Sequence, residues 1–228
     1  MINEVTDKDL FEHLKSSCPE DWHDYIRHPF VLNLADGSLR EESFRHYLTQ
    51  DYVFLKHFSR AWALAVYKAD TLQDMKEASA ILDGLLNQEM ALHIEYCQAW
   101  GIEPETIEAT TEARANMAYT RYVLDAGMSG DLLDLLVALA PCVVGYAEIA
   151  EERMADTETQ LSTNPYSKWL ETYAADDYQQ LATQMKRQLN TLAAQRATTA
   201  RLPALKKHFL HATRLEQDFW TMGLDCSF

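Results

Sequence analysis

Residues 41 to 68 carry the pattern that most restricts the fold of this chain. Apolar side chains recur there every third or fourth residue, which is the spacing of one face of an α-helix. The recurring residues are Phe44, Tyr47, Leu48, Leu55, Phe58 and Trp62. A strand would need alternation with a period of two, and this segment lacks it. The pattern therefore predicts one long helix with a single apolar face.

Similar helical patterns follow one another through the rest of the sequence. The 228 residues include only 7 glycines and 6 prolines, which is little material for the many turns of an all-β fold. The predicted helices cover about residues 6–15 (capped by Thr6), 19–27, 41–68, 71–99, a short segment from 104, 111–126, 130–155, 164–173, 176–195 and 203–222. The second is expected to end at HPF, and LADGSLREESF to form a turn. Without a repeat or a linker, the sequence predicts an all-α multi-helix bundle that forms a single domain over residues 1–228.

The charge of the chain excludes one class of partner. The 20 basic and 35 acidic residues give 20 − 35 = −15, and such a surface repels the phosphates of nucleic acids. The N-terminal sequence MINEVTDKDLFEHL lacks the basic end and apolar stretch of a signal peptide. No uninterrupted apolar run reaches the ~18 residues of a membrane span, so no membrane partner is expected. The four cysteines lack C-x-x-C spacing, which predicts free thiols in a cytoplasmic protein.

Two carboxylates interrupt the apolar faces of predicted helices. Asp51 lies on the face of the 41–68 helix, one turn before Phe54, and Glu216 lies on the inner face of the last helix. A buried carboxylate is costly unless it is paired, and desolvation raises its pKa. Either acid alone could make a structural hydrogen bond. Two of them in one small domain favour a polar cavity.

The stretch LAPCVVGYAEIAE, residues 139–151, places a thiol between two helix-weakening residues. Pro141 removes a helical hydrogen bond and is expected to kink the helix, so that Cys142 lies near the start of a new half-helix. Such a helix end lowers the pKa of a thiol. Gly145 is expected to leave room beside the sulfur. The sequence leaves two interpretations open: an activated nucleophile, or an inert buried cysteine beside a packing kink.

Several tyrosines lie on the same predicted helices as these groups. Tyr119 lies on the 111–126 helix, Tyr146 lies one turn after Cys142, and Tyr173 ends the segment NPYSKWLETY. Any one of them could simply fill the core. As a set, they could line a pocket for a flat ring.

Histidines and acids at helical spacing could indicate a metal instead. The pairs are Glu20/His23, Glu42/His46, Glu89/His93 and His208/His211. A di-iron bundle needs two Glu-x-x-His pairs on long facing helices, and only Glu20/His23 has that spacing. An axial haem ligand at His13 or His23 would be nonspecific. We therefore predict no metal and no cofactor.

Seven segments, in this order and spacing, closely resemble the TenA family. They are HPFV, LTQDYVFL, NQEMALH, MAYTRYVLD, APCVVGYAEI, NPYSKWLETY and LEQDFW, and the resemblance covers roughly residues 20 to 223. This family comprises the thiaminase II, or aminopyrimidine aminohydrolase, enzymes. The resemblance implies a haem-oxygenase-like helical fold that binds no haem, and a homotetramer.

The resemblance also implies residue roles. Cys142 matches the nucleophilic cysteine, which places the chain in the cysteine-type branch, and Glu216 matches the acid/base glutamate. Asp51 matches the aspartate that binds the aminopyrimidine. Phe54, Tyr119, Tyr146 and Tyr173 match aromatic positions of the pocket, with Phe54 replacing a tyrosine of some members. Glu89 and His93 lie in a family motif, but no role follows for them.

The activity implied by the resemblance is hydrolysis in thiamin salvage. The expected substrates are 4-amino-5-aminomethyl-2-methylpyrimidine, which yields the hydroxymethyl pyrimidine and ammonia, and thiamin itself. Two other classes stay open. One is a haem-oxygenase-like oxidase, either metal-dependent or cofactorless, and the other is a non-catalytic pyrimidine-binding regulator.

Overall fold

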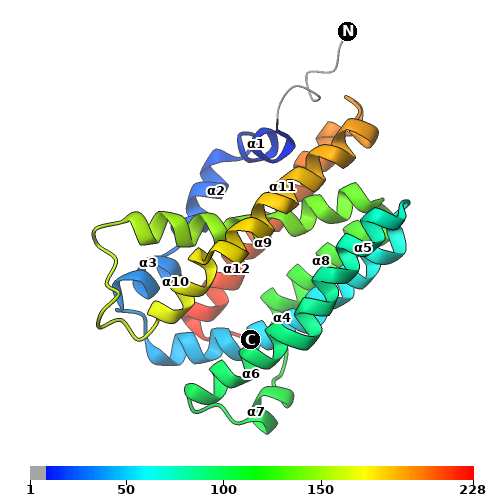
Figure 1. The fold of residues 1–228 in the computed structure, drawn as a ribbon. Helices are drawn as coiled ribbons and strands as arrows, with labels where there is room; N and C mark the ends of the chain where they lie inside the picture. Colours follow the sequence, from blue (N-terminus) through cyan, green and yellow to red (C-terminus); the bar gives the residue numbers. More distant parts are fainter. Residues whose placement is uncertain (1–8) are drawn as a thin grey trace. The chain divides into compact units, whose positions relative to one another are not determined.

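The computed structural model describes residues 9–228 and confirms the all-α prediction, because it contains helices and no strand in that range (Figure 1). The helices are α1 (Leu10–Lys15), α2 (Pro19–Ile26), α3 (Pro29–Asp36), α4 (Glu41–Lys68), α5 (Leu72–Gly84), the π-helix η1 (Leu85–Glu89), α6 (Met90–Ala99), α7 (Pro104–Glu108), α8 (Arg114–Ser129), α9 (Leu132–Ala155), α10 (Ser167–Ala174), α11 (Asp176–Arg196) and α12 (Leu202–Asp225).

The helices group into two compact units. Unit 1 comprises Met1–Leu39 and Leu136–Gln217, and unit 2 comprises Arg40–Leu135 and Asp218–Phe228. Each unit is therefore built from two separate stretches of chain. Helices α9 and α12 cross the boundaries, so each contributes residues to both units.

Most predicted helices are confirmed within a few residues, and α4 has the predicted bounds. Thr6 lies outside the described residues, and the side chain of Asp9 caps α1 by accepting a hydrogen bond from the backbone of Glu12. The prediction for the segment after α2 was wrong. Pro29 begins an additional helix, α3, which ends at Gly37 with φ 80°. Only glycine adopts this left-handed backbone without strain, so Gly37 is the reason that α3 ends there.

The single helix predicted for residues 71–99 is interrupted by η1. A π-helix inserts extra backbone into one turn and rotates the residues that follow it relative to those before it. The insertion lies directly before α6, which carries His93, and it ends at Glu89. Because π-helical turns are frequent at functional sites, this stretch is a candidate for more than packing.

In unit 1, aromatic rings join α1, α2 and α12. Trp22 stacks on Phe209 with centroids 5.4 Å apart, and Phe11 meets both rings edge-on. Trp22 also donates through Nε1 to the carboxylate of Glu148 on α9, at 3.0 Å. Buried rings contribute large apolar areas, so these contacts hold the N-terminal helices on α9 and α12.

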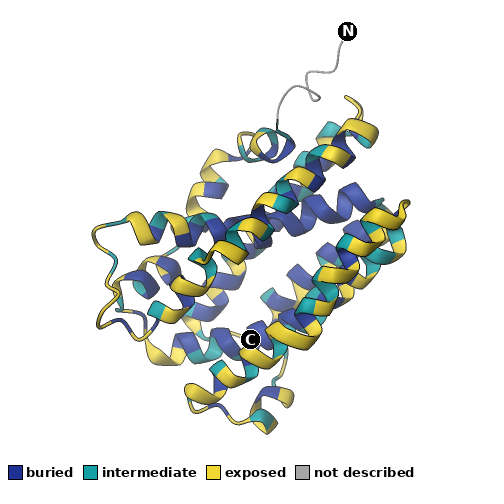
Figure 2. Ribbon diagram, in the orientation of Figure 1, coloured by how far each residue is buried: buried dark blue, intermediate teal, exposed yellow. Residues whose placement is uncertain are grey.

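In unit 2, α4 is the central helix and packs against α5, α6 and α8. Its buried face includes the predicted Phe44, Tyr47, Leu48 and Trp62. Tyr47 also packs on Trp220 near the end of α12, with centroids 5.6 Å apart. Figure 2 shows the alternation of buried and exposed residues along these helices that the sequence periodicity predicts.

Helix α9 is apolar and long enough to cross a membrane by length and composition alone. However, 94% of the residues in its most apolar window are buried inside the protein, as the continuous buried stretch in Figure 2 shows. The core helix of a globular protein has the same properties. The finding is therefore weak evidence for a membrane span.

Candidate functional site

The seven residues predicted to form a site divide between the two units. Unit 2 carries Asp51, Phe54 and Tyr119, and unit 1 carries Cys142, Tyr146, Tyr173 and Glu216. All but Tyr173 are buried, and Tyr173 is half-buried.

Asp51 is a carboxylic acid in the core of unit 2. Only 7% of the residue is exposed, and desolvation raises the pKa of its carboxyl group to about 7. Burial disfavours the charged form because the protein interior solvates it less well than water does. The predicted burial of this acid is confirmed. Near neutral pH, Asp51 can therefore both donate and accept hydrogen bonds.

Aromatic rings lie one turn along α4 from Asp51. Phe54 packs on Tyr119 of α8 with centroids 5.3 Å apart and an interplanar angle of 33°, and it meets Phe219 edge-on at 5.6 Å. The spacing of three residues between Asp51 and Phe54 puts both on the same side of α4. The structure thus places the three predicted unit 2 residues on neighbouring surfaces of α4 and α8.

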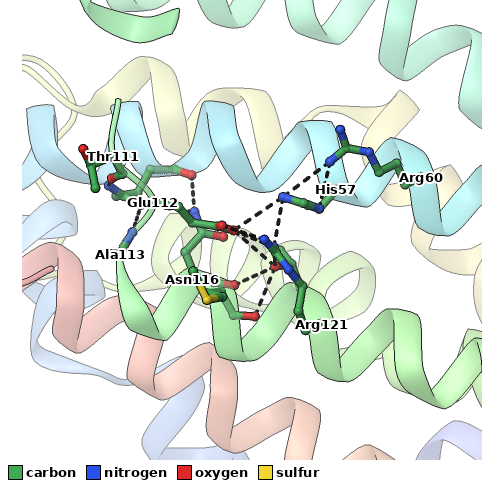
Figure 3. A network of polar contacts seen from close by, with 10 residues as sticks. His57, Arg60, Thr111, Glu112, Ala113, Asn116 and Arg121 are labelled. Carbon is green, nitrogen blue, oxygen red and sulfur yellow. Dashed lines mark hydrogen bonds and ion pairs between the residues drawn. The ribbon is translucent and has the colours of Figure 1, made fainter. Parts of the chain in front are cut away.

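Gln50, directly before Asp51, fixes the start of α8 relative to α4. Its side-chain amide donates to the carbonyl of Thr111 at 2.8 Å and accepts from the backbone of Ala113 at 3.0 Å. Asn116 returns a hydrogen bond to the Gln50 carbonyl at 2.7 Å. Figure 3 shows these contacts at the turn that leads into α8. Gln50 is fully buried, so the first residue of the QD pair positions Tyr119 through the backbone of α8. The sequence analysis assigned it no role.

A second set of contacts holds the same turn from the outside (Figure 3). Arg121 donates through both terminal nitrogens to the two carboxylate oxygens of Glu112, each at 2.7 Å. The two ring nitrogens of His57 on α4 each lie 2.9 Å from a guanidinium group, Nδ1 from Arg60 and Nε2 from Arg121. The pKa of His57 is lowered, first by desolvation and then by the charge of Arg121. The ring is therefore neutral at pH 7, and its one unprotonated nitrogen accepts from one of the two guanidinium groups.

Three more titratable side chains surround Asp51, and sequence analysis left their roles open. His93 lies 3.5 Å from Asp51, measured between Nδ1 and Oδ2. Glu89 is solvent-accessible, yet the surrounding protein desolvates it and, with the charge of Asp51, raises its pKa to about 7. Burial and Asp51 raise the pKa of Cys97 to about 12. The four-residue spacing of Glu89 and His93 and their place in the motif NQEMALH were the available sequence signals.

In unit 1, Cys142 lies within an uninterrupted helix. Helix α9 continues through Pro141, so the predicted restart of the helix at Cys142 was wrong, and a helix end does not activate the thiol. Gly145 was predicted to leave room beside the sulfur of Cys142, and this prediction was also wrong. The Tyr25 ring occupies the position of a side chain at Gly145, and its hydroxyl donates to the Pro141 carbonyl at 3.1 Å. Pro141 and Gly145 therefore serve the packing of α2 on α9.

The rings of Tyr146 and Tyr173 are in contact. Their ring centroids are 5.0 Å apart, and Trp169 of α10 lies beside both rings, at 5.6 and 4.6 Å. Gln179 at the start of α11 donates to the carbonyls of Ala147 and Tyr173, at 3.1 and 2.9 Å. These two bonds hold α10 against the α9 turn that follows Cys142. The sequence did not indicate this role for Gln179.

Glu216 is almost fully buried, with 1% of the residue exposed, which confirms its predicted position on the inner face of α12. The residues on either side of it attach α12 to α2. Arg214 pairs with the Asp21 carboxylate at 2.6 Å, and Gln217 donates to the Asp21 carbonyl at 2.6 Å. The contacts turn those neighbours toward α2 and fix the rotation of the helix at Glu216.

No group of three or more His, Cys, Asp or Glu side chains within residues 9–228 has an arrangement that could hold a metal ion. The Glu89/His93 pair considered in the sequence analysis thus lacks a third ligand among the described residues. The expected absence of a metal or other cofactor stays a prediction.

Residues 17–226 match the TENA/THI-4/PQQC family. The chain belongs to this family. An uncharacterized protein of Haemophilus influenzae is 41% identical over 216 residues, which cover 95% of this chain and 99% of that protein. The aminopyrimidine aminohydrolase of Halalkalibacterium halodurans is 36% identical over 203 residues, or 89% of each chain. The resemblance inferred from the sequence motifs is therefore confirmed.

Solved structures agree on the architecture. A structure described as a TenA family transcription regulator, from Silicibacter, has a TM-score of 0.89 at 45% identity and covers 94% of this chain and 96% of its own. A domain of unknown function with a heme oxygenase-like fold, from Shewanella denitrificans, has a TM-score of 0.71 at 15% identity and covers 99% and 94%. At that identity, the second likeness concerns the fold alone. It confirms the predicted haem-oxygenase-like fold for this TenA family member.

Proposed function

We propose that this chain is an aminopyrimidine aminohydrolase of thiamin salvage. It converts 4-amino-5-aminomethyl-2-methylpyrimidine and water into the 5-hydroxymethyl pyrimidine and ammonia, and it cleaves thiamin at the equivalent bond. The observation that carries the proposal is Asp51, a buried carboxyl group with a pKa raised to about 7 and an aromatic pair on the next turn. A neutral aminopyrimidine presents a flat ring and a donor–acceptor edge to such a group. The Halalkalibacterium relative of this chain is named an aminopyrimidine aminohydrolase, which also supports the proposal.

The proposed chemistry is covalent catalysis by Cys142. The thiolate adds to the electron-poor ring, and the ring electrons expel the exocyclic amine, which leaves as ammonia after protonation. Water then adds to the exocyclic carbon and loses a proton, and departure of the sulfur restores the aromatic ring and the thiolate. Atoms and charge balance in this reaction with water as the only co-reactant. The proposal therefore needs no metal or organic cofactor.

Glu216 is proposed to carry the proton in both halves of the reaction. It protonates the departing amine, and the resulting carboxylate takes a proton from the attacking water, so that it ends each turnover as it began. Asp51 binds the amino group and the adjacent ring nitrogen, while Phe54, Tyr119, Tyr146 and Tyr173 cover the ring and exclude water. In this proposal Cys142 forms the covalent bond to the ring, Glu216 transfers protons, and Asp51 orients the ring.

Replacement of the nucleophile tests the proposal. Cys142→Ser is expected to lower ammonia release from the aminomethyl pyrimidine by at least about 10³-fold, because a serine hydroxyl is a far weaker nucleophile than a thiolate. The affinity for the hydroxymethyl product, measured by calorimetry, is expected to stay within a few-fold of wild type. Cys18→Ser is the matched control: Cys18 is also buried, and burial raises its pKa to about 11. Ammonia release by Cys142→Ser at the wild-type rate would contradict the assignment.

A regulator on the same scaffold is the second candidate, because the Silicibacter structure is described as a TenA family transcription regulator. A regulator would bind the pyrimidine and release no ammonia. The wild-type ammonia assay separates the two functions directly, and metal analysis of the same preparation tests for an oxidase. The homotetramer and cytoplasmic location implied by the resemblance belong to the proposal as well. Sedimentation of the purified protein tests the tetramer.

A further inference from the structure

The ring of His93 is held in one tautomer. Its Nε2 lies 2.9 Å from the carbonyl oxygen of Leu48, and a carbonyl can only accept a hydrogen bond. Nε2 therefore carries the proton in the neutral ring. The other nitrogen, Nδ1, then presents a lone pair to Oδ2 of Asp51 at 3.5 Å. Both side chains are buried, so water screens this contact only weakly.

A lone pair on Nδ1 and an ionised carboxylate would repel each other at this distance. One proton on the pair removes the repulsion, whether it lies on the carboxyl group or on the imidazole. Desolvation raises the pKa of Asp51 to about 7 and lowers the pKa of His93, and both effects favour two neutral groups. The ligand-free pair is therefore a carboxylic acid beside a neutral imidazole.

The groups packed around the pair favour the same state. Desolvation and the charge of Asp51 raise the pKa of Glu89 on η1 to about 7, so Glu89 and Asp51 do not both carry a full negative charge near neutral pH. Cys97 on α6 stays a neutral thiol because its pKa is raised to about 12. Tyr52 stacks on the His93 ring with centroids 6.4 Å apart, and its hydroxyl donates to Glu108.

The remaining elements packed on α4 add few charges. Glu108 also accepts from Lys56 at 3.4 Å. Helix α8 contributes the phenol of Tyr119 to the buried interior, and α5 contributes only Ala78.

A neutral carboxyl group matches the edge of a neutral 4-aminopyrimidine. The ring nitrogen accepts one hydrogen bond and the amino group donates one, so a carboxylic acid completes both bonds. A carboxylate would instead direct a lone pair at the ring nitrogen. The proton on Asp51 thus decides whether the pyrimidine edge is recognised.

We propose that His93 is a positioning residue that keeps this proton on Asp51 and fixes the carboxyl group for the pyrimidine edge. The Nδ1 lone pair faces Oδ2 and disfavours a negative charge on the carboxyl group, so the single acidic proton of Asp51 stays available to the pyrimidine ring nitrogen. Nε2–H holds the ring in place through the Leu48 carbonyl of α4. The inference deepens the proposed function and rests on it, because the ligand is the aminopyrimidine of that reaction. It also assigns a role to the motif NQEMALH, which the proposed reaction does not otherwise use.

The variant His93→Gln distinguishes the contribution of Nδ1 from that of Nε2. The glutamine amide can still donate to the Leu48 carbonyl, but nothing replaces the Nδ1 lone pair at Asp51. The pH at which Asp51 ionises is expected to fall by about one unit, read from its carboxylic acid band in infrared difference spectra against Asp51→Asn. Product affinity is then expected to match wild type at about pH 5 and to be about tenfold weaker at pH 8, since one pKa unit is a factor of ten.

His46→Gln is the matched control. His46 also lies on α4, its Nε2 also lies 3.0 Å from a backbone carbonyl, that of Ser227, and burial lowers its pKa as well. Neither the infrared titration nor the affinity profile is expected to change in this variant. Equal profiles for wild type and His93→Gln, or an equal loss of affinity at every pH, would overturn the positioning role.

A measurement on the wild type keeps the inference testable if His93→Gln fails to fold. Nitrogen chemical shifts of the His93 ring should show the Nε2–H tautomer at pH 7, and a proton on Nδ1 would overturn the assignment. The infrared and nitrogen measurements need no ligand. If wild type fails to bind the pyrimidine or to release ammonia, the proposed function fails, whereas an unshifted Asp51 titration in a pyrimidine-binding protein rejects the role of His93 alone.

Discussion

At the scale of single residues, the buried carboxyl of Asp51 is costly to the folded state. Its pKa rises from 3.8 to about 7 because of desolvation, so the folded protein binds a proton that the unfolded chain has already lost. Between those two pH values the unfolded state binds fewer protons, and the free energy of unfolding falls as pH rises. Above pH 7 the penalty is complete, at up to about 4 kcal/mol by the usual conversion of pKa into free energy. A group retained at such a cost is consistent with a role in recognition.

Asp51→Asn is therefore expected to stabilise the protein at alkaline pH while weakening product binding. Urea unfolding at pH 5 and pH 8 should show a smaller loss of stability with rising pH than in wild type, because an amide does not ionise. The lowered pKa of His93 acts in the opposite direction below pH 6.5 and is present in both proteins. An unchanged pH dependence of the unfolding free energy would mean that Asp51 is already neutralised in another way.

At the scale of elements, Gly145 sets the distance between α2 and α9. A β-carbon there would lie 2.8 Å from Cζ of the Tyr25 ring, well inside van der Waals contact. Tyr25 is fully buried, and its hydroxyl is bonded to α9, so the ring has little freedom to withdraw. The glycine that weakens α9 as a helix thus permits a close helix–helix packing one turn from Cys142.

Gly145→Ala is expected to destabilise the protein by about 1–3 kcal/mol, as overpacking of a core does. Gly84→Ala is the control, because Gly84 is helical with φ −58° and a β-carbon there would meet nothing within 4 Å. That substitution should stabilise by about 0.5–1 kcal/mol through the unfolded state. The midpoints of urea denaturation measure both effects, and equal shifts in the two variants would refute the packing role of Gly145.

At the scale of the whole molecule, the two compact units are joined by shared helices. The chain passes from unit 1 into unit 2 at Arg40, returns within α9 and crosses once more within α12. Unfolding of either unit would remove part of a helix whose remainder belongs to the other. Helix formation is cooperative, so the loss of one part destabilises the rest.

We therefore predict one cooperative thermal transition, as the single domain proposed from the sequence requires. Calorimetric and van't Hoff enthalpies should agree, and circular dichroism and tryptophan fluorescence should give coincident curves. The hydroxymethyl product should raise the midpoint of the whole transition by mass action. Two separate transitions, or a ligand effect on only one of them, would show that the units unfold independently.

Much of the fold was predictable because helical periodicity is local. The spacing of Phe44, Tyr47 and Trp62 depends only on the geometry of one helix, and α4 has the predicted bounds. The same periodicity placed Asp51 and Glu216 on buried faces, and both are buried. It did not reveal η1, because few residues of α5, η1 and α6 are buried, and a shift of register has little apolar pattern there in which to appear.

The sequence by itself thus determined the all-α class, the family, and the acids that lie on apolar faces, since these follow from local spacing and motif order. Only the tertiary structure decided which groups meet. Tyr25 fills the space at Gly145, Gln50 holds the start of α8, and the Leu48 carbonyl selects the tautomer of His93. Such contacts depend on how helix faces from distant parts of the chain pack, and the periodicity of one helix carries no information about its partner.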